Sequence, residues 1–166
     1  QRLQNAQSGA CQADWHYWSQ SAISTAPIER YSLVSQQQIM DGARQAAASK
    51  AQRYCIVISG RSPLDREIDE IAGAVRSIKQ EIPIQICCSL GLMNEQQAKR
   101  LKAAGGERVN HNLNTSEAFH AGICTPHTFQ DRLSTHRSAL RAGEEIGSGC
   151  NLEMGWEAGD YCDSGF

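Results

Sequence analysis

The alternation of short apolar runs with amphipathic segments constrains the fold of this chain more than any other feature. The runs RYCIVISG (residues 53–60) and IQICCSLG (residues 84–91) are rich in β-branched residues and end at a glycine, as buried parallel strands do. Residues 65–80, between them, carry apolar side chains at the three-and-four spacing of an amphipathic helix. These side chains are Ile68, Ile71, Ala72, Val75 and Ile78. The order strand, helix, strand indicates a βα unit of a parallel sheet.

Three further helices are expected. The first covers residues 35–49, and the second covers residues 94–104, where Asn94 and Gln97 have the spacing of a capping box. The third is expected to begin at the Thr125-Pro126 pair, because proline is favoured in the first helical turn. Its buried face is expected to hold Phe129, Leu133, His136 and Leu140.

Two more strands are expected, RVNHNLNTS (residues 108–116) and a segment within residues 144–155. Counted generously, about five strands alternate with helices, which indicates an α/β fold with a parallel sheet. At 166 residues the chain fits a single domain. We expect βα units over residues 31–146 and an irregular segment, richer in Gly, Asp and Trp, over residues 147–166.

Charge and composition narrow the function. The net charge is −2 and basic residues form no run, so we expect no nucleic-acid partner. The sequence shows neither a long apolar stretch nor a signal-peptide pattern, so we expect no membrane association and a cytoplasmic location. Seven cysteines at irregular spacing do not form a secreted disulfide pattern. They are either cluster ligands or reduced thiols in a packed interior.

Residues 5–30, NAQSGACQADWHYWSQSAISTAPIER, resemble the cofactor-binding loop of biotin synthase, a radical S-adenosylmethionine enzyme, which reads K-S-G-x-C-P-E-x-C-x-Y-C-x-Q-S-A. The likeness extends over residues 7–155 and includes YCIVISGR, CCSLG, AKRLKAAG, VNHNLNTS, ICTPHTFQDR and GSGCNLEMG. It implies a partial TIM-type (β/α) barrel of about five parallel βα units, with residues 1–30 as a cluster-type loop. The matching loop residues are Ser8, Gly9, Cys11, Tyr17, Gln20, Ser21 and Ala22.

The resemblance implies radical insertion of sulfur into dethiobiotin, with S-adenosylmethionine as the cofactor. In the family three loop cysteines bind a four-iron cluster, but here Trp15 and Trp18 occupy the second and third positions. An indole offers no ligand comparable to a thiolate. With Cys11 as the one matching cysteine, we expect the loop not to hold this cluster in the family manner, and the activity to be impaired or lost.

Further roles are implied residue by residue. The family's second, two-iron cluster is bound by three cysteines and an arginine on a later strand; Cys55 and Cys87 match two of them, and Gly147 stands at the third. The implied metal ligands are therefore Cys11, Cys55 and Cys87. The implied S-adenosylmethionine contacts are Tyr17, Ser59, Gly60, Asn110, Asn112, Asn114 and Arg132.

The residue types suit these roles. Asn110, Asn112 and Asn114 alternate, so a strand would place all three on one face. The guanidinium of Arg132 suits the carboxylate of S-adenosylmethionine, and Tyr17 matches the aromatic residue beside the adenine.

Four other interpretations remain open. His120, Cys124 and His127 have the spacing of part of a zinc site. The chain could be a cluster-free S-adenosylmethionine or nucleotide-binding module, or an engineered or degenerate scaffold with a role in assembly. The resemblance implies about three further βα units after Gly155, so a sheet of five strands would have open edges, through which copies could form a homo-oligomer.

Overall fold

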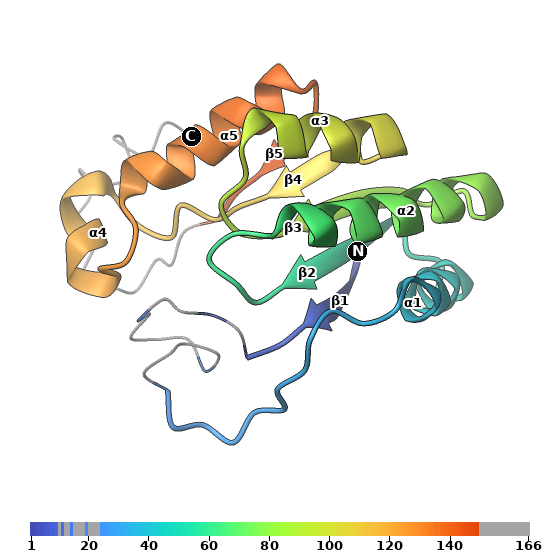
Figure 1. The fold of residues 1–166 in the computed structure, drawn as a ribbon, viewed down its shortest axis with the longest axis horizontal. Coiled ribbons are helices and arrows are strands. Elements are labelled where there is room, and N and C mark those ends of the chain that lie inside the picture. The colour runs from blue at the N-terminus through green and yellow to red at the C-terminus, as the bar shows by residue number, and fades with distance from the viewer. Residues whose placement is uncertain (10, 12–13, 15–18, 20–23, 150–166) are drawn as a thin grey trace.

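In the computed structural model, the five strands of the described residues form one parallel sheet (Figure 1). The described residues are 1–149 except 10, 12–13, 15–18 and 20–23. The strands follow the chain in the order β1-β2-β3-β4-β5. Their bounds are β1 (Arg2–Gln7), β2 (Arg53–Ile58), β3 (Gln85–Ser89), β4 (Arg108–Asn110) and β5 (Glu145–Gly147). This simple order, in which each strand pairs with the next along the chain, is that of a segment of a (β/α) barrel.

Helices connect these strands, and four of them pack side by side along one face of the sheet (Figure 1). These four are α1 (Gln36–Ala48), α2 (Asp65–Glu81), α3 (Glu95–Ala104) and α5 (Phe129–Arg141). A short helix, α4 (Glu117–Ile123), lies beyond the carboxyl ends of the strands. The partial (β/α) barrel expected from the sequence is therefore confirmed.

The core lies between the sheet and the four helices. Along β2, Tyr54, Ile56 and Ile58 belong to this core, whereas Cys55 and Val57 alternate with them and line a cavity on the other face. This is the period-two pattern of a strand. The helical side of the core is supplied by the apolar stripe of α2, as its periodicity predicts.

Some boundaries differ from the sequence-based expectation. The helix expected from Thr125 begins at Phe129, because the Thr128 side chain caps it by accepting a hydrogen bond from the Asp131 amide. Leu140 was expected on its buried face but is 60% exposed. The buried positions include Phe129 and His136 as expected, together with polar Arg132 and Thr135.

Strand β4 is also shorter than expected, since it ends at Asn110 and the rest of VNHNLNTS continues outside the strand. The segment expected as a last strand has β5 in its described part, and residues 150–155 lie outside the described residues.

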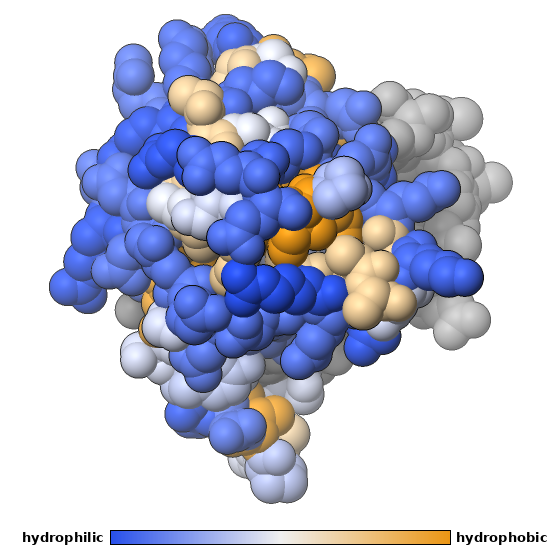
Figure 2. Space-filling view, turned by 90° about the vertical axis from the view of Figure 1, so that its right-hand side faces the viewer, coloured by the Kyte–Doolittle hydropathy of each residue, from blue (hydrophilic) through white to orange (hydrophobic). Residues whose placement is uncertain are grey.

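The two ends of the sheet differ in character. The strand arrowheads in Figure 1 point toward α4, so the carboxyl ends of the strands meet there. Figure 2 shows the opposite end, which is mostly hydrophilic around a small apolar patch. In the described part of the chain, no helix combines the length and apolar character needed to cross a bilayer.

Candidate functional site

A cavity of about 350 Å³ lies on the inner face of the sheet, at the carboxyl ends of the strands. The ends of β2, β3 and β4 contribute to its wall, as does Cys11 from the loop after β1. The structure brings most of the expected site residues together here. Those that line the cavity are Cys11, Cys55, Gly60, Asn110, Asn112, Asn114 and Arg132.

Two of the expected residues, Ser59 and Cys87, do not line the cavity, and the position of a third is not described. Ser59 is 1% exposed, and its amide donates a hydrogen bond to the Gln7 carbonyl, so it holds β2 to β1. Cys87 is buried next to Cys55 on β3. Tyr17 lies outside the described residues, as do Trp15 and Trp18.

The three asparagines form a polar wall. The Asn110 side-chain amide donates a hydrogen bond of 3.4 Å to Asn112 Oδ1. Asn114 has a φ of +69°, a left-handed conformation that asparagine tolerates better than most residues. The backbone amide of Asn114 donates a hydrogen bond to the Gly149 carbonyl at 3.0 Å. The backbone after β4 is therefore held against the segment after β5, and the amide side chains remain on the cavity side.

Arg132 reaches the same wall from α5. Its Nε donates to the Asn112 carbonyl at 2.5 Å, and its Nη1 lies 3.0 Å from His127 Nε2. Burial and the neighbouring Arg132 charge lower the pKa of His127 to about 4. At neutral pH the imidazole is therefore uncharged, and its Nε2 can accept a hydrogen bond from Arg132 Nη1. Arg132 thus supplies a positive charge and also positions the backbone at Asn112.

His111, which lies between Asn110 and Asn112 in the sequence, adds an imidazole to the polar wall of the cavity. It is 5% exposed, and its Nε2 has no hydrogen-bond partner among the described residues. Burial lowers the pKa of His111 well below its usual range, so the ring is neutral. Its backbone carbonyl accepts a hydrogen bond of 2.6 Å from His136 Nε2. A neutral imidazole nitrogen without a protein partner suits a polar ligand.

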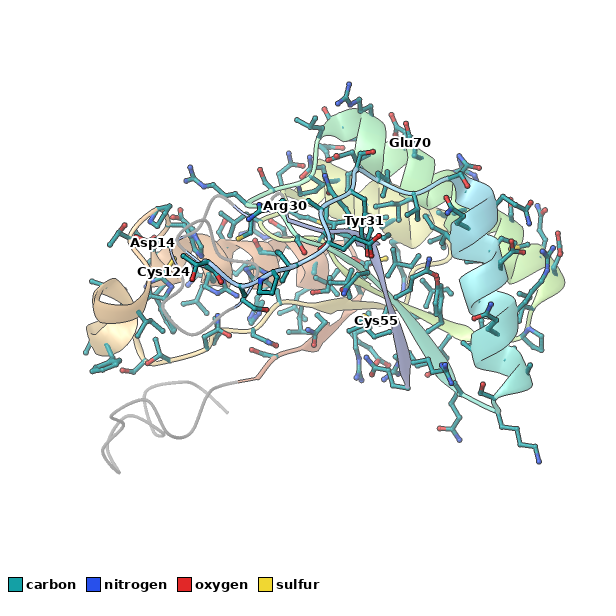
Figure 3. The ribbon with its side chains drawn as sticks, turned by 90° about the horizontal axis from the view of Figure 1, so that it is seen from below. Asp14, Arg30, Tyr31, Cys55, Glu70 and Cys124 are labelled. Carbon is teal, nitrogen blue, oxygen red and sulfur yellow. The ribbon has the colours of Figure 1, made fainter. Side chains whose placement is uncertain are left out.

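The loop after β1 is fastened at both ends. Ser8 and Tyr31 form a two-way backbone bridge at 3.1 Å, and Arg30 Nη1 donates to the Gly9 carbonyl at 2.8 Å. Further along, the Asp14 carboxylate accepts a 2.9 Å hydrogen bond from the Thr125 amide and a second from the Thr125 hydroxyl. These hydrogen bonds lower the pKa of Asp14. Figure 3 shows Asp14 beside Cys124, next to α4, so the loop reaches across to the segment that precedes α5.

The Cys55–Cys87 pair and the zinc-like motif of His120, Cys124 and His127 lie on different segments. Cys55 and Cys87 occupy paired positions on β2 and β3. A hydrogen bond between the two thiols and burial raise the pKa of Cys55, and the same hydrogen bond lowers that of Cys87. In the zinc-like motif, Cys124 Sγ lies 3.7 Å from His127 Nδ1, and the rings of His120 and His127 are 5.7 Å apart. Among the described residues, no three His, Cys, Asp or Glu side chains are grouped to hold a metal ion.

Sequence reasoning did not assign Arg61 and Leu92 to the cavity, which they line. Gly91 brings their segments together, because its φ is +81° and a Cβ there would lie 2.6 Å from the Arg61 carbonyl oxygen. The Leu92 amide donates to the same oxygen at 2.8 Å. The signal in the sequence that could have identified these two residues is the glycine that follows each of the neighbouring strands, Gly60 after β2 and Gly91 after β3.

The chain resembles known proteins in sequence. The model of the radical SAM superfamily matches residues 11–152. A biotin synthase of Bacillus pumilus (strain SAFR-032) is 49% identical over 151 residues, which are 91% of this chain and 46% of that protein. A biotin synthase of Rhodopirellula baltica is 46% identical over 164 residues, which are 99% of this chain and 46% of that protein. The chain therefore spans about half the length of the curated relatives it matches.

Solved structures share the fold. The crystal structure of methylornithine synthase (PylB) superposes with a TM-score of 0.81 at 16% identity, covering 98% of this chain and 48% of that one. The hydrogenase maturase HydG from Carboxydothermus hydrogenoformans gives a TM-score of 0.75 at 18% identity, covering 90% of this chain and 36% of that one. At these identities the likeness concerns the fold alone.

Proposed function

The chain belongs to the radical SAM superfamily and is biotin synthase-like in sequence, and from this premise we propose that its cavity binds S-adenosylmethionine. The proposed activity class is that of biotin synthase, a sulfur insertion into dethiobiotin, impaired in this chain because its cluster ligands are incomplete. The observation that carries the proposal is the convergence of five expected S-adenosylmethionine contacts, Gly60, Asn110, Asn112, Asn114 and Arg132, on one cavity.

The chemistry of the wall supports the proposed ligand. The amide side chains of Asn110, Asn112 and Asn114 both donate and accept hydrogen bonds, as the hydroxyls and the base edge of a nucleoside require. Arg132 supplies the positive charge that a carboxylate would pair with. His111 Nε2, buried without a partner among the described residues, supports a further polar contact. The residues present therefore fit S-adenosylmethionine.

The iron–sulfur clusters of the family do not fit in the same way. A four-iron cluster requires several thiolates, and the loop has Cys11 with tryptophans at the other two ligand positions. For the two-iron cluster, a Cβ at Gly147 would lie 2.9 Å from Asn110 Oδ1 and 3.2 Å from Arg108 Cδ. Both atoms belong to side chains, and Gly147 itself supplies no thiolate where the resemblance expects the third one. The proposal therefore assigns no reaction step to either cluster.

Two finer points belong to the same proposal. Cys55, Cys87, Cys88 and Cys124 are buried thiols without disulfides, which supports a reducing compartment such as the cytoplasm. β1 and β5 pair on one side only within the described sheet, so contact between copies through these edges is proposed as well. Sedimentation that shows a compact monomer at all concentrations would count against such contact.

Titration of the iron-free chain with S-adenosylmethionine by calorimetry tests the binding proposal. We expect one ligand per chain, and roughly a two- to tenfold weaker affinity for Asn112→Ala, because one neutral hydrogen bond is worth about 0.5–1.5 kcal/mol. Gln37→Ala, which removes an exposed amide side chain on α1, is the matched control and should bind like the wild type. If Asn112→Ala binds S-adenosylmethionine as tightly as the wild type does, the proposal that this cavity is the binding site is wrong.

A further inference from the structure

The cavity wall contains a second guanidinium group, that of Arg61. This residue is exposed, follows β2 directly after Gly60 and lines the cavity. Its backbone is fixed, because its carbonyl accepts the 2.8 Å hydrogen bond from the Leu92 amide. Arg61 takes part in none of the ion pairs between described residues. Its charge acts at longer range on Asp131, whose carboxylate accepts a hydrogen bond from the Thr128 amide and does not line the cavity.

The described wall of the cavity is positively charged. Among the described residues that line it, Arg61 and Arg132 supply guanidinium groups, and none is an Asp or a Glu. Burial lowers the pKa of His111 and of His127 below the usual range, so both rings are neutral at pH 7. An anionic ligand would therefore balance the charge of this wall.

The two guanidinium groups reach the cavity from different elements. Buried Arg132 comes from α5 and is held at the wall after β4 by its bond to the Asn112 carbonyl. Arg61 follows β2, and β3 lies between β2 and β4, so the two points of attachment are about 10 Å apart. S-adenosylmethionine has one carboxylate, which the proposed function pairs with Arg132. Arg61 is therefore left for a second anionic group.

Apolar side chains accompany Arg61 in the wall. Val57 lines the cavity from the inner face of β2, and Leu92 lines it next to the Arg61 carbonyl. A guanidinium beside apolar surface suits a carboxylate at the end of an aliphatic chain, because the chain leaves water while the charged end stays paired. A small inorganic anion would leave this apolar surface uncovered.

We propose that Arg61 is a specificity-determining residue that binds the carboxylate of an aliphatic acid, whose chain lies against Val57 and Leu92. Dethiobiotin, the substrate in the proposed function, is an acid of this class, so the inference rests on that function. The planar guanidinium of Arg61 can bind the carboxylate through two hydrogen bonds. Arg61 selects and orients the acid and takes no part in bond making.

Calorimetric titration of the full chain with dethiobiotin and with its methyl ester tests this role. The ester keeps the ring and the chain but lacks the negative charge. We expect the wild type to bind the acid roughly five- to fiftyfold more tightly than the ester, because the ester cannot form the partly exposed charge pair. Arg61→Gln should weaken binding of the acid alone and so lose the preference, whereas Arg61→Lys should keep part of it. An unchanged affinity for the ester shows that the variant is folded.

Arg66→Gln is the matched control, because it removes an exposed guanidinium on α2 that does not line the cavity. It should keep the wild-type preference, and an equal loss would assign the preference to net charge instead of Arg61. Equal binding of acid and ester by the wild type, or an unchanged preference in Arg61→Gln, would overturn the role of Arg61 alone. If neither compound binds the wild type, dethiobiotin is not the substrate and the role of Arg61 is wrong as well, while the titration with S-adenosylmethionine tests the cofactor proposal separately.

Discussion

At the scale of single residues, the least expected group is Glu144, a carboxyl buried on the helical side of the sheet. It is 3% exposed, and neither of its oxygens has a hydrogen-bond partner among the described residues. A Cβ at Gly106 would lie 2.9 Å from its Oε1, so the side chain occupies space that the glycine leaves open. The groups that interact electrostatically with it are Lys102 of α3 and the thiols of Cys87 and Cys88 on β3.

Burial raises the pKa of Glu144 from its usual 4.5 to about 7. The folded state therefore retains a proton that the unfolded state releases, and stability should fall as the pH rises from about 4.5 to about 7. Glu144→Gln should remove this decline. The free energy of unfolding of the variant minus that of the wild type should therefore be larger at pH 8 than at pH 4, by on the order of 2–3 kcal/mol. Urea unfolding at several pH values measures this quantity.

The control for the lost charge is Glu70→Gln, an exposed position on α2. Its stability should follow the pH profile of the wild type. If Glu144→Gln shows the same pH profile as the wild type as well, the carboxyl is not buried as the structure has it.

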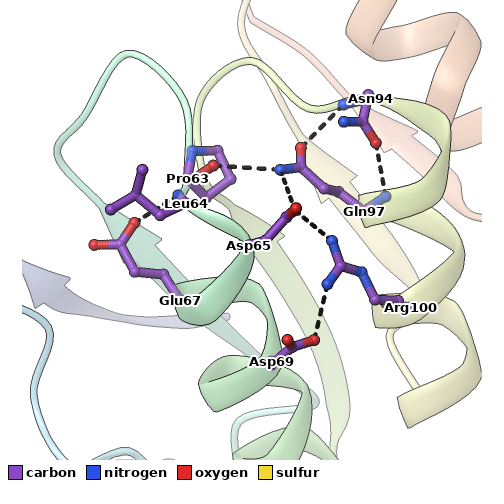
Figure 4. A network of polar contacts seen from close by, with 8 residues as sticks. All are labelled: Pro63, Leu64, Asp65, Glu67, Asp69, Asn94, Gln97 and Arg100. Atoms are coloured by element: carbon purple, nitrogen blue, oxygen red, sulfur yellow. Dashed lines mark hydrogen bonds and ion pairs between the residues drawn. The ribbon is translucent and has the colours of Figure 1, made fainter.

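At the scale of elements, α2 and α3 are joined by a polar network at their amino ends (Figure 4). Asn94 and Gln97 form the capping box of α3, as the sequence predicts. Buried Gln97 also donates to the Pro63 carbonyl at 3.3 Å and to Asp65 Oδ1 at 3.1 Å. Arg100 forms ion pairs with Asp65 and, at 2.9 Å, with Asp69. The acidic start of α2, readable as a solvated helix end, therefore fastens one helix to the next.

The hydrogen bonds of Gln97 should contribute more to the free energy of unfolding than the ion pairs of Arg100. Gln97→Ala should lower the free energy of unfolding by about 1–3 kcal/mol, because it removes one arm of the capping box and two buried or half-buried hydrogen bonds. Arg100→Ala should lower it by less than about 1 kcal/mol, because its ion pairs are exposed to solvent. Chemical denaturation of both variants decides the order, and a larger loss for Arg100→Ala would contradict it.

Sequence reasoning found the elements that carry strong apolar periodicity and missed those that do not. β2 and β3 lie close to their expected places because each is a short, nearly continuous apolar run, and α2 and α3 do so because each has a buried apolar stripe at helical spacing. β1 (RLQNAQ) was not assigned, since Ala6 is its one buried residue. α4 was missed because a helix of seven residues with two buried side chains shows no usable period.

In the candidate site, too, some features were predicted from the sequence and others were not. The asparagines and Arg132 were identified from motif residues, and the carboxyl ends of parallel strands do meet there. The bond from Arg132 to the Asn112 carbonyl and the His127 contact depend on tertiary packing, so spacing along the chain could not reveal them. The same holds for the contact between Asp14 and Thr125, which are 111 residues apart.

At the scale of the whole molecule, the chain has the fold of a radical SAM protein and a cavity in which we propose that the cofactor binds, while the thiolates expected for the clusters are incomplete. Solved structures with the same fold superpose over 98% and 90% of this chain. The expected polar wall is assembled around one cavity. In contrast, by the family resemblance the loop has one cysteine at the three expected ligand positions, and Gly147 stands where the resemblance places a further cysteine. The central claim is therefore a retained ligand site without the family's complete clusters.

Anaerobic reconstitution with iron and sulfide, followed by counting both elements and recording the absorption spectrum, tests this claim most directly. We predict well below four iron atoms per chain and no four-iron absorption, because one loop thiolate cannot replace three. The Cys11→Ser variant should give the same iron count as the wild type. About four iron atoms and four sulfides per chain, lost on Cys11→Ser, would contradict the account and restore the complete radical-enzyme site.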